Sequence, residues 1–224
     1  MEIPSFCSVY KKDQVLFGGY PTKEWFQTLC DIGITLFVDL TTRYEKQSFP
    51  YVYTNHAMPG GVSTMSFPIR DNYIPYDTDS FRGFIIKLGD QIQKGVKIYI
   101  HCRGGHGRSG MTIASLMCYV DNIHPIKALD VTTRMHLERK DLKLKYRSLK
   151  CPDNYIQRNY VTDLFYPVYI SDHFFKKKIA FNLFDFITMT KTRPLLNTKE
   201  HDSVIVEILM NFRSQLHRYD LARA

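Results

Sequence analysis

The sequence lacks any long uninterrupted run of apolar residues, any internal repeat and any low-complexity segment, and it has a single tryptophan. A transmembrane helix needs about 20 consecutive apolar residues, so we expect no membrane span. The first residues, Met1 to Pro4, lack the charged and apolar regions of a signal peptide. The last residues, Leu221 to Ala224, lack the cysteine of a prenylation motif, so we expect no lipid anchor there.

Cysteine is also scarce, and its five copies show neither metal-type spacing nor an evident pairing. They are Cys7, Cys30, Cys102, Cys118 and Cys151. An odd number of cysteines without a secretory signal is typical of a reducing compartment. We therefore expect a cytoplasmic or nuclear protein, and we expect no metal site.

The composition is that of an ordinary globular protein with a positive balance. Of the 224 residues, 44% are hydrophobic and 23% are charged, which is enough apolar material for one domain with an appendage. The chain has 30 Lys and Arg against 22 Asp and Glu, a net charge of +8. A positive balance favours anionic partners, and nucleic acid is one of them.

A cysteine and an arginine separated by five residues stand near the middle of the chain. The residues from His101 to Gly110 read His-Cys-Arg-Gly-Gly-His-Gly-Arg-Ser-Gly. The β-branched and aromatic segment 96–100 predicts a buried strand before this loop, and the apolar segment 109–121 predicts a buried helix after it. Glycines in the loop allow positive φ and a close approach of the backbone to a ligand. These glycines are Gly104, Gly105 and Gly107.

This pattern places a nucleophile beside an anion site. Backbone amides at a helix N-terminus and the helix dipole both favour a negative charge, and they favour thiolate over thiol at Cys102. Arg108 has the planar guanidinium that holds two phosphoryl oxygens and neutralises charge developing on them. Ser109 is expected to donate a hydrogen bond to the sulfur. His101 is expected to position the loop through hydrogen bonds rather than to transfer a proton.

The loop resembles the His-Cys-x5-Arg-Ser/Thr signature of the cysteine-dependent protein tyrosine phosphatases. The resemblance implies that Cys102 becomes a phosphocysteine and that the loop and Arg108 bind the phosphate, without a metal ion or another cofactor. The loop residues concerned are Arg103, Gly104, Gly105, His106 and Gly107.

An alcohol or phenol leaves phosphorus readily only when a general acid protonates it. The segment from Phe67 to Pro75 resembles the acid loop of the dual-specificity subgroup, with Asp71 in the place of the acid. Asp77 and Asp79 are alternatives, although they also suit the N-cap and the first turn of the next helix. Rhodanese-like proteins have a similar cysteine loop but no comparable acid loop, so Asp71 favours the phosphatase fold.

The same resemblance assigns two supporting residues. The stretch from Asp39 to Glu45 is similar to one whose glutamate supports the active-site loop, and the alternative is that Glu45 lies on the plain surface. The stretch from Pro152 to Gln157 is similar to a helix start whose glutamine places the hydrolytic water. The alternative for Gln157 is a solvated helix residue.

Local patterns and the resemblance together predict the fold. Thr22 is a suitable N-cap for a short helix, and 35–40 has the composition of a strand. Further helices are expected over 78–94 and 125–139. We expect residues 1–165 to form an α/β domain with a central, mostly parallel sheet of four to five strands flanked by helices.

Beyond residue 165 the resemblance ends. Residues 166–224 are expected to form a helical extension, with amphipathic stretches over 171–190 and 198–219. We expect the extension to pack on the catalytic domain or to form a homodimer interface. The other interpretation is an arm that binds a partner.

A dense run of charge extends from Glu138 to Arg147. Such runs usually form a solvated face, and that is the expectation here. The alternative is that the run steers an anionic partner towards Cys102.

The resemblance also bears on the substrate. The chain has no clear counterpart of the loop that deepens the pocket of strictly tyrosine-specific phosphatases. This favours a shallow cleft and, as substrates, proteins that carry phosphotyrosine, phosphoserine or phosphothreonine.

Three other interpretations of the loop stay open. RNA 5′-triphosphatases of the same fold tend to lack an acid such as Asp71, and phosphoinositide phosphatases often carry lysines where Arg103 and His106 stand. A non-catalytic phosphoprotein-binding module is the third, but such modules usually lose the cysteine, the arginine or the aspartate.

Overall fold

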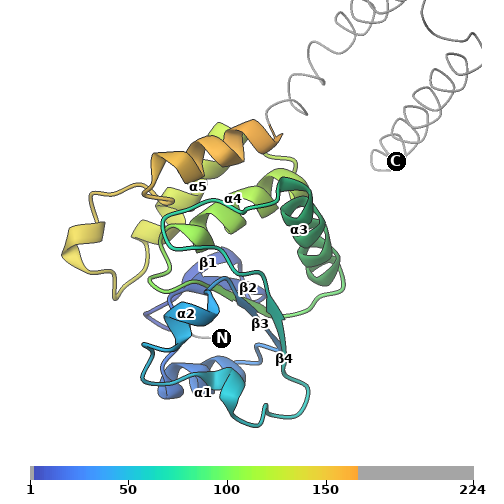
Figure 1. Ribbon diagram of the computed structural model, residues 1–224, viewed down its shortest axis with the longest axis vertical. Helices are drawn as coiled ribbons and strands as arrows, with labels where there is room; N and C mark the ends of the chain where they lie inside the picture. The colour runs from blue at the N-terminus through green and yellow to red at the C-terminus, as the bar shows by residue number, and fades with distance from the viewer. Residues whose placement is uncertain (1–2, 166–224) are drawn as a thin grey trace, which may run out of the picture. The chain divides into compact units, whose positions relative to one another are not determined.

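The computed structural model of the protein describes residues 3–165. Their centre is a five-stranded sheet with the strand order β1-β2-β5-β3-β4 (Figure 1). The β1–β2 pair is antiparallel and the other three pairs are parallel. The strands are Ser8–Lys11 (β1), Val15–Gly18 (β2), Leu36–Asp39 (β3), Ser63–Ser66 (β4) and Ile98–His101 (β5). The predicted α/β class, with a mostly parallel sheet, is confirmed.

Two of the long helices begin at residues whose side chains cap them. The Thr22 side chain accepts a hydrogen bond from Trp25 N at 3.2 Å, as the N-cap prediction required, and Asp77 accepts one from Ser80 N at 2.8 Å. A further helix covers residues 155–165. The other helices are Lys23–Asp31 (α1), Arg43–Lys46 (α2), Thr78–Gln93 (α3), Arg108–Val120 (α4) and Pro125–Leu137 (α5), and 3₁₀ turns cover Tyr53–Asn55 and Leu144–Tyr146.

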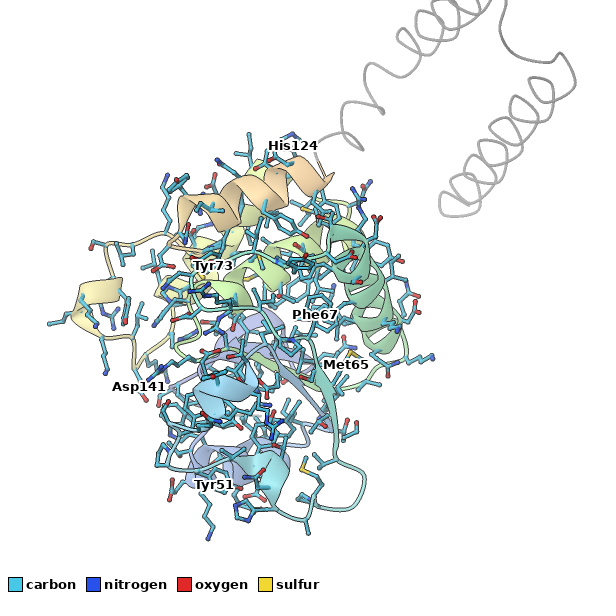
Figure 2. All side chains as sticks on the ribbon, viewed as in Figure 1. Tyr51, Met65, Phe67, Tyr73, His124 and Asp141 are labelled. Carbon is cyan, nitrogen blue, oxygen red and sulfur yellow. The ribbon has the colours of Figure 1, made fainter. Side chains whose placement is uncertain are left out.

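The helices cover the two faces of the sheet. In Figure 1, α3, α4 and α5 lie on one side and α1 on the other. Because side chains alternate along a strand, Ile98 and Ile100 of β5 join the core under α3 to α5, whereas Tyr99 joins the core under α1. Figure 2 shows Phe67 on the α3 side and Tyr51 on the α1 side. Both faces of the central strand are therefore buried.

The parallel register places the carboxyl ends of three strands side by side. Gly18 at the end of β2 and Asp39 at the end of β3 both pair with His101 at the end of β5. In open α/β sheets, ligands bind beyond the carboxyl ends of the strands. The loop that starts at Cys102 leaves the central strand at this edge, between the loops that follow β2 and β3.

The predicted helices over 171–190 and 198–219 lie outside the described residues, as does the whole extension 166–224. The boundary at residue 165 and the homodimer interface therefore stay predictions. Within residues 3–165, no helix combines the length and the hydrophobicity that a membrane crossing requires.

Candidate active site

The loop between β5 and α4 is shaped around the Cys102 sulfur. The Cys102 residue is only 2% exposed, and the Gly105 amide donates a hydrogen bond to its Sγ at 3.2 Å. Gly105 has φ of 74°, and a Cβ there would overlap the backbone of Gly18 and Gly19. The turn therefore requires glycine. Gly107, the N-cap of α4, makes no side-chain cap, so the first amides of the helix are open to an anion.

Arg108, the first residue of α4, has a guanidinium with partners on two other loops. Its Nη2 and Nη1 donate to the two oxygens of Glu45 at 2.7 and 2.8 Å. Nη2 also donates to Asp71 Oδ1 at 2.8 Å, and Nη1 donates to the Ile69 carbonyl at 2.8 Å. The Arg108 residue is 1% exposed. This one side chain joins the cysteine loop, α2 and the acid loop.

One donor of the Arg108 guanidinium is left for an anion. The Nε–H is buried and has no acceptor among the described residues. Both hydrogens of Nη2 are used, since Nη2 donates to Glu45 and to Asp71. A phosphoryl group held by Nε and Nη2 together would therefore replace Asp71 at Nη2, because Glu45 occupies the other edge.

The contacts between Arg108 and Glu45 keep both of these side chains charged. Burial lowers the pKa of Arg108, but the hydrogen bond to Glu45 and the charges of Cys102, Glu45 and Asp71 outweigh it, so the net pKa is raised. Burial raises the pKa of Glu45, but hydrogen bonds from Arg108 and from the Thr42 backbone bring it below its usual range. An ion pair held in this way is a fixed part of the site.

Glu45 is set in place by its own helix. It forms a capping box at the start of α2, in which its Oε2 accepts from Thr42 N at 2.9 Å and from Thr42 Oγ1 at 3.0 Å. Its side chain is largely buried. Glu45 therefore supports the loop through Arg108 and is not the plain surface residue of the alternative interpretation.

The acid loop is held beside Arg108 by two residues that come much later in the sequence, Asn154 and Gln157. Asp71 is half exposed, with 54% of its side chain accessible, and its neighbour Asn72 has φ of 63°. Asn154 donates to the Asn72 carbonyl at 2.7 Å, and Gln157 Nε2 donates to the Tyr73 carbonyl at 2.8 Å. These two bonds fix the segment that carries Asp71.

The two alternative aspartates are used elsewhere. Asp77 caps α3 through its bond to Ser80 N at 2.8 Å. Asp79 forms an exposed ion pair with Arg82 at 2.8 Å. Only Asp71 of the three contacts Arg108.

Gln157 is not the solvated helix residue of the alternative interpretation. It is 1% exposed, and its Oε1 is buried without a hydrogen-bond partner among residues 3–165. A Cβ on Gly107 would lie 2.6 Å from that oxygen, so the Gln157 amide packs directly on the cysteine loop. This unused acceptor therefore lies beside the cysteine loop.

Two predicted contacts of the loop differ in the structure. Ser109 Oγ donates to the Gly18 carbonyl at 3.3 Å rather than to Cys102 Sγ, because the end of β2 lies against the start of α4. The Gly105 amide is the donor to the sulfur instead. His101 is buried, with its Nε2 2.7 Å from Tyr53 Oη, and this hydrogen bond holds the end of β5 from which the loop leaves.

The side chains of Arg103 and His106 are engaged away from Arg108. His106 Nδ1 lies 2.6 Å from His136 Nε2, and the His106 ring stacks on Tyr146 with a centroid distance of 3.8 Å. The Arg103 guanidinium lies 5.7 Å above the ring of Phe49. The His106 ring is therefore occupied by His136 and Tyr146, and the backbone amides of Arg103 and His106 are the groups suited to the predicted phosphate site. A cavity of about 230 Å³ opens on this side of the loop, lined by Arg103, His106, Lys143 and Tyr146 among others.

Several residues of the site could not be predicted from the sequence. Tyr53, His136 and Asn154 reach the site only because distant segments pack together. Arg139 corrects a prediction, since it belongs to the charged run expected to be solvated and yet is buried. The reason is that its guanidinium donates hydrogen bonds to Ser8 and Gly105.

Among residues 3–165, no group of three His, Cys, Asp or Glu is arranged to hold a metal ion.

The buried histidines predict an acid-sensitive fold. Burial lowers the pKa of His101 to about 4, against about 6.5 in an unfolded chain. Between these values the unfolded chain binds a proton that the folded chain excludes, so the free energy of unfolding falls as the pH falls through this window. We expect His101→Asn to remove about 1–2 kcal/mol of the difference between pH 7.5 and pH 5. Urea unfolding at the two pH values measures it.

The exposed His56 provides the control. His56→Asn should keep the pH dependence of the wild type. An equal pH dependence in His101→Asn and wild type would show that His101 is not excluded from protonation in the folded state.

Comparison with known proteins adds independent evidence. Residues 4–150 match the family model described as "PTP-SAK: Swiss Army Knife protein, DSP-PTPase phosphatase domain". The chain is 43% identical over 140 residues to "Putative tyrosine phosphatase 197R" of Invertebrate iridescent virus 6, covering 61% of this chain and 50% of the relative. It is 35% identical over 162 residues to "Putative tyrosine phosphatase 067L" of Invertebrate iridescent virus 3, covering 71% and 65%. The chain thus spans half to just under two thirds of the length of these curated relatives.

Solved structures share the fold. Tk-PTP in the active form superposes with a TM-score of 0.56 at 19% identity, covering 71% of this chain and 95% of that one. PTPMT1 in complex with PI(5)P gives a TM-score of 0.52 at 14% identity, covering 71% and 96%. The match to the family model extends over more than half of the chain and includes Glu45, Asp71, Cys102 and Arg108. The chain therefore belongs to the PTP-SAK family of DSP-PTPase phosphatase domains.

Proposed function

We propose that the domain of residues 1–165 is a protein phosphatase that hydrolyses phosphate monoesters of tyrosine, serine and threonine. The observation that carries the proposal is the convergence at Arg108. Its guanidinium contacts Asp71 at 2.8 Å and keeps a buried Nε–H without an acceptor in the described part of the chain, and it begins the helix whose loop surrounds Cys102. A nucleophile, an anion clamp and an acid are the parts that phosphoryl transfer to cysteine requires.

In the first step, the Cys102 thiolate attacks phosphorus in line with the leaving oxygen. The phosphorus–sulfur bond forms as the phosphorus–oxygen bond breaks, and Asp71 gives its proton to the leaving oxygen. A bound phosphoryl dianion competes with Asp71 for Arg108. The loop amides and Arg108 stabilise the charge on the three equatorial oxygens.

In the second step, water attacks the phosphocysteine and the sulfur leaves as thiolate. Asp71, now ionised, accepts a proton from the water, and inorganic phosphate is released. The Gln157 Oε1, buried beside Gly107 without a partner in the described part of the chain, is placed to accept the other hydrogen of that water. Its amide nitrogen meanwhile holds the acid loop through Tyr73.

The proposed breadth of substrate rests on the surface around the loop. Asp71 is half exposed, so an acid beside the phosphate is reachable without a deep channel. The intracellular location and the homodimer stay predictions.

Replacing the nucleophile tests the reaction. Cys102→Ser should lower kcat for an aryl phosphate by at least about 10³-fold, because the hydroxyl is not ionised, while a phosphopeptide still binds. Steady-state turnover and isothermal titration measure the two effects. Cys30→Ser, a change on α1 away from the loop, is the control. Undiminished turnover by Cys102→Ser would rule out the phosphocysteine route.

Replacing the acid tests the leaving-group step. Asp71→Ala should slow hydrolysis of phenyl phosphate at pH 5.5 roughly 10²–10⁴-fold. The loss should be smaller for p-nitrophenyl phosphate, whose leaving group needs less protonation. Asp79→Ala, which removes only an exposed ion pair, should stay within about twofold of wild type. An equal loss on both substrates, or an unchanged pH profile in Asp71→Ala, would assign the acid elsewhere.

A panel of substrates tests the class. We expect kcat/KM to be higher for phosphotyrosine and phosphothreonine peptides than for a phosphoinositide or a 5′-triphosphorylated RNA, with phosphate release as the readout. Fastest turnover of the RNA or of the phosphoinositide would contradict the assignment to proteins. Tight peptide binding without turnover of any substrate would instead indicate a binding module.

A further inference from the structure

Arg139 is a buried cation without a matching carboxylate. It is 6% exposed, although it stands in the charged run after α5. Each ion pair found among residues 3–165 involves another cation, so no described carboxylate lies within 4.0 Å of it. Burying an unpaired charge is costly, and proteins normally pair it or place it near an anion site.

The contacts of Arg139 point to the cysteine loop. Its Nη2 donates to the Gly105 carbonyl at 2.9 Å and its Nε donates to Ser8 Oγ at 3.1 Å. Its guanidinium lies 5.9 Å from the centre of the Phe17 ring. All three partners are neutral, so they orient the cation without cancelling its charge.

Gly105 is the residue through which Arg139 acts. Its amide donates to Cys102 Sγ, and its positive φ of 74° is a backbone conformation that residues other than glycine rarely adopt. In a planar trans peptide the C=O and the next N–H point in opposite directions. With the Gly105 carbonyl turned outward to Arg139, the His106 amide is turned inward, where the loop binds an anion.

The charge balance of the site also calls for a second cation. Arg108 carries one positive charge but contacts two carboxylates, Glu45 and Asp71. With a thiolate at Cys102 this group is net negative before any phosphate arrives. Exposed cations nearby are screened by solvent, whereas a buried one is not. Arg139 is the buried cation that faces the loop from the α5 side.

We propose that Arg139 is a positioning residue of this site, which holds the Gly105 peptide and supports the Cys102 thiolate and the bound phosphoryl group with its uncompensated charge. The proposal rests on the proposed function, since it needs an anion at the loop. It assigns a role to a residue of the charged run, and it explains why this one charged position of the run is buried.

Other ionisable groups face the same loop and are present in every variant at residue 139. They are Glu45 of α2, Asp71 of the acid loop, His101 of β5, Arg103, His106 and Arg108 of the loop and α4, His136 of α5, Cys7 before β1, Tyr99 of β5 and Cys151. Burial is the larger influence on the pKa values of His106, His136, Cys7 and Cys151 among them, but the charge of Arg139 lowers all four, and Arg139→Lys keeps that charge.

Alkylation of Cys102 by iodoacetamide reports the thiolate without turnover. At pH 6 we expect Arg139→Met to be alkylated about tenfold more slowly than wild type, because a nearby positive charge has been lost, and the difference should vanish at pH 9. The rate is read by mass spectrometry of the peptide that contains Cys102. In the same variant, kcat/KM for p-nitrophenyl phosphate should fall by at least about tenfold.

Arg139→Lys separates charge from structure. Lysine keeps the charge but not both hydrogen bonds, so its alkylation rate at pH 6 should stay within about threefold of wild type. Lys140→Met, which removes an exposed charge next in the chain, should match wild type in both assays. Circular dichroism checks that each variant is folded. If Arg139→Met is not folded, the alkylation rate of Arg139→Lys at pH 6 tests the proposal.

Slow alkylation at pH 6 in Arg139→Lys, or a wild-type rate in a folded Arg139→Met, would overturn the proposal. A wild-type protein that hydrolyses no phosphate monoester would contradict the proposed function instead. The alkylation rates would still show whether Arg139 supports the thiolate.

Discussion

A buried guanidinium must find anionic partners inside the protein, and Arg108 finds one on helix α2 and one on the acid loop. Glu45 holds one edge of it, and Asp71 approaches Nη2. Breaking a buried pair typically costs about 3–5 kcal/mol, so the largely buried Glu45 is held firmly to the start of α4, whereas the half-exposed Asp71 is held less tightly. The same pairing leaves the Nε of Arg108, which has no acceptor in the described part of the chain, for an anion.

The sheet makes this meeting possible. Because β2, β5 and β3 run parallel in register, Gly18, His101 and Asp39 end at one edge, and the loops that follow them share one small volume. Gly18 packs so closely on Gly105 that no Cβ fits. The loop geometry therefore depends on the neighbouring strand as much as on its own glycines.

The loops of the site are held in place by side chains from segments that follow the last strand in the sequence. Asn154 and Gln157 hold the acid loop by its carbonyls, and Arg139 holds the cysteine loop by the carbonyl of Gly105. In each case a long side chain bonds to backbone, which fixes the position of a loop more firmly than a contact between two flexible side chains.

The sequence by itself determined what depends on neighbouring residues: the strand–loop–helix around Cys102, the spacing to Arg108, the N-caps at Thr22 and Asp77, and the α/β class. It also indicated Asp71 and Glu45, because their surrounding residues form a recognisable pattern. Only the tertiary structure decided the polar partners. Ser109 bonds to Gly18 instead of the sulfur, Gln157 is buried against Gly107, and Arg139 leaves a charged run to reach Gly105. The physical reason is that hydrogen bonds and ion pairs act over a few ångströms. Which groups come that close is set by the packing of segments that lie as far apart in sequence as Ser8 and Arg139, and the local sequence carries no record of it.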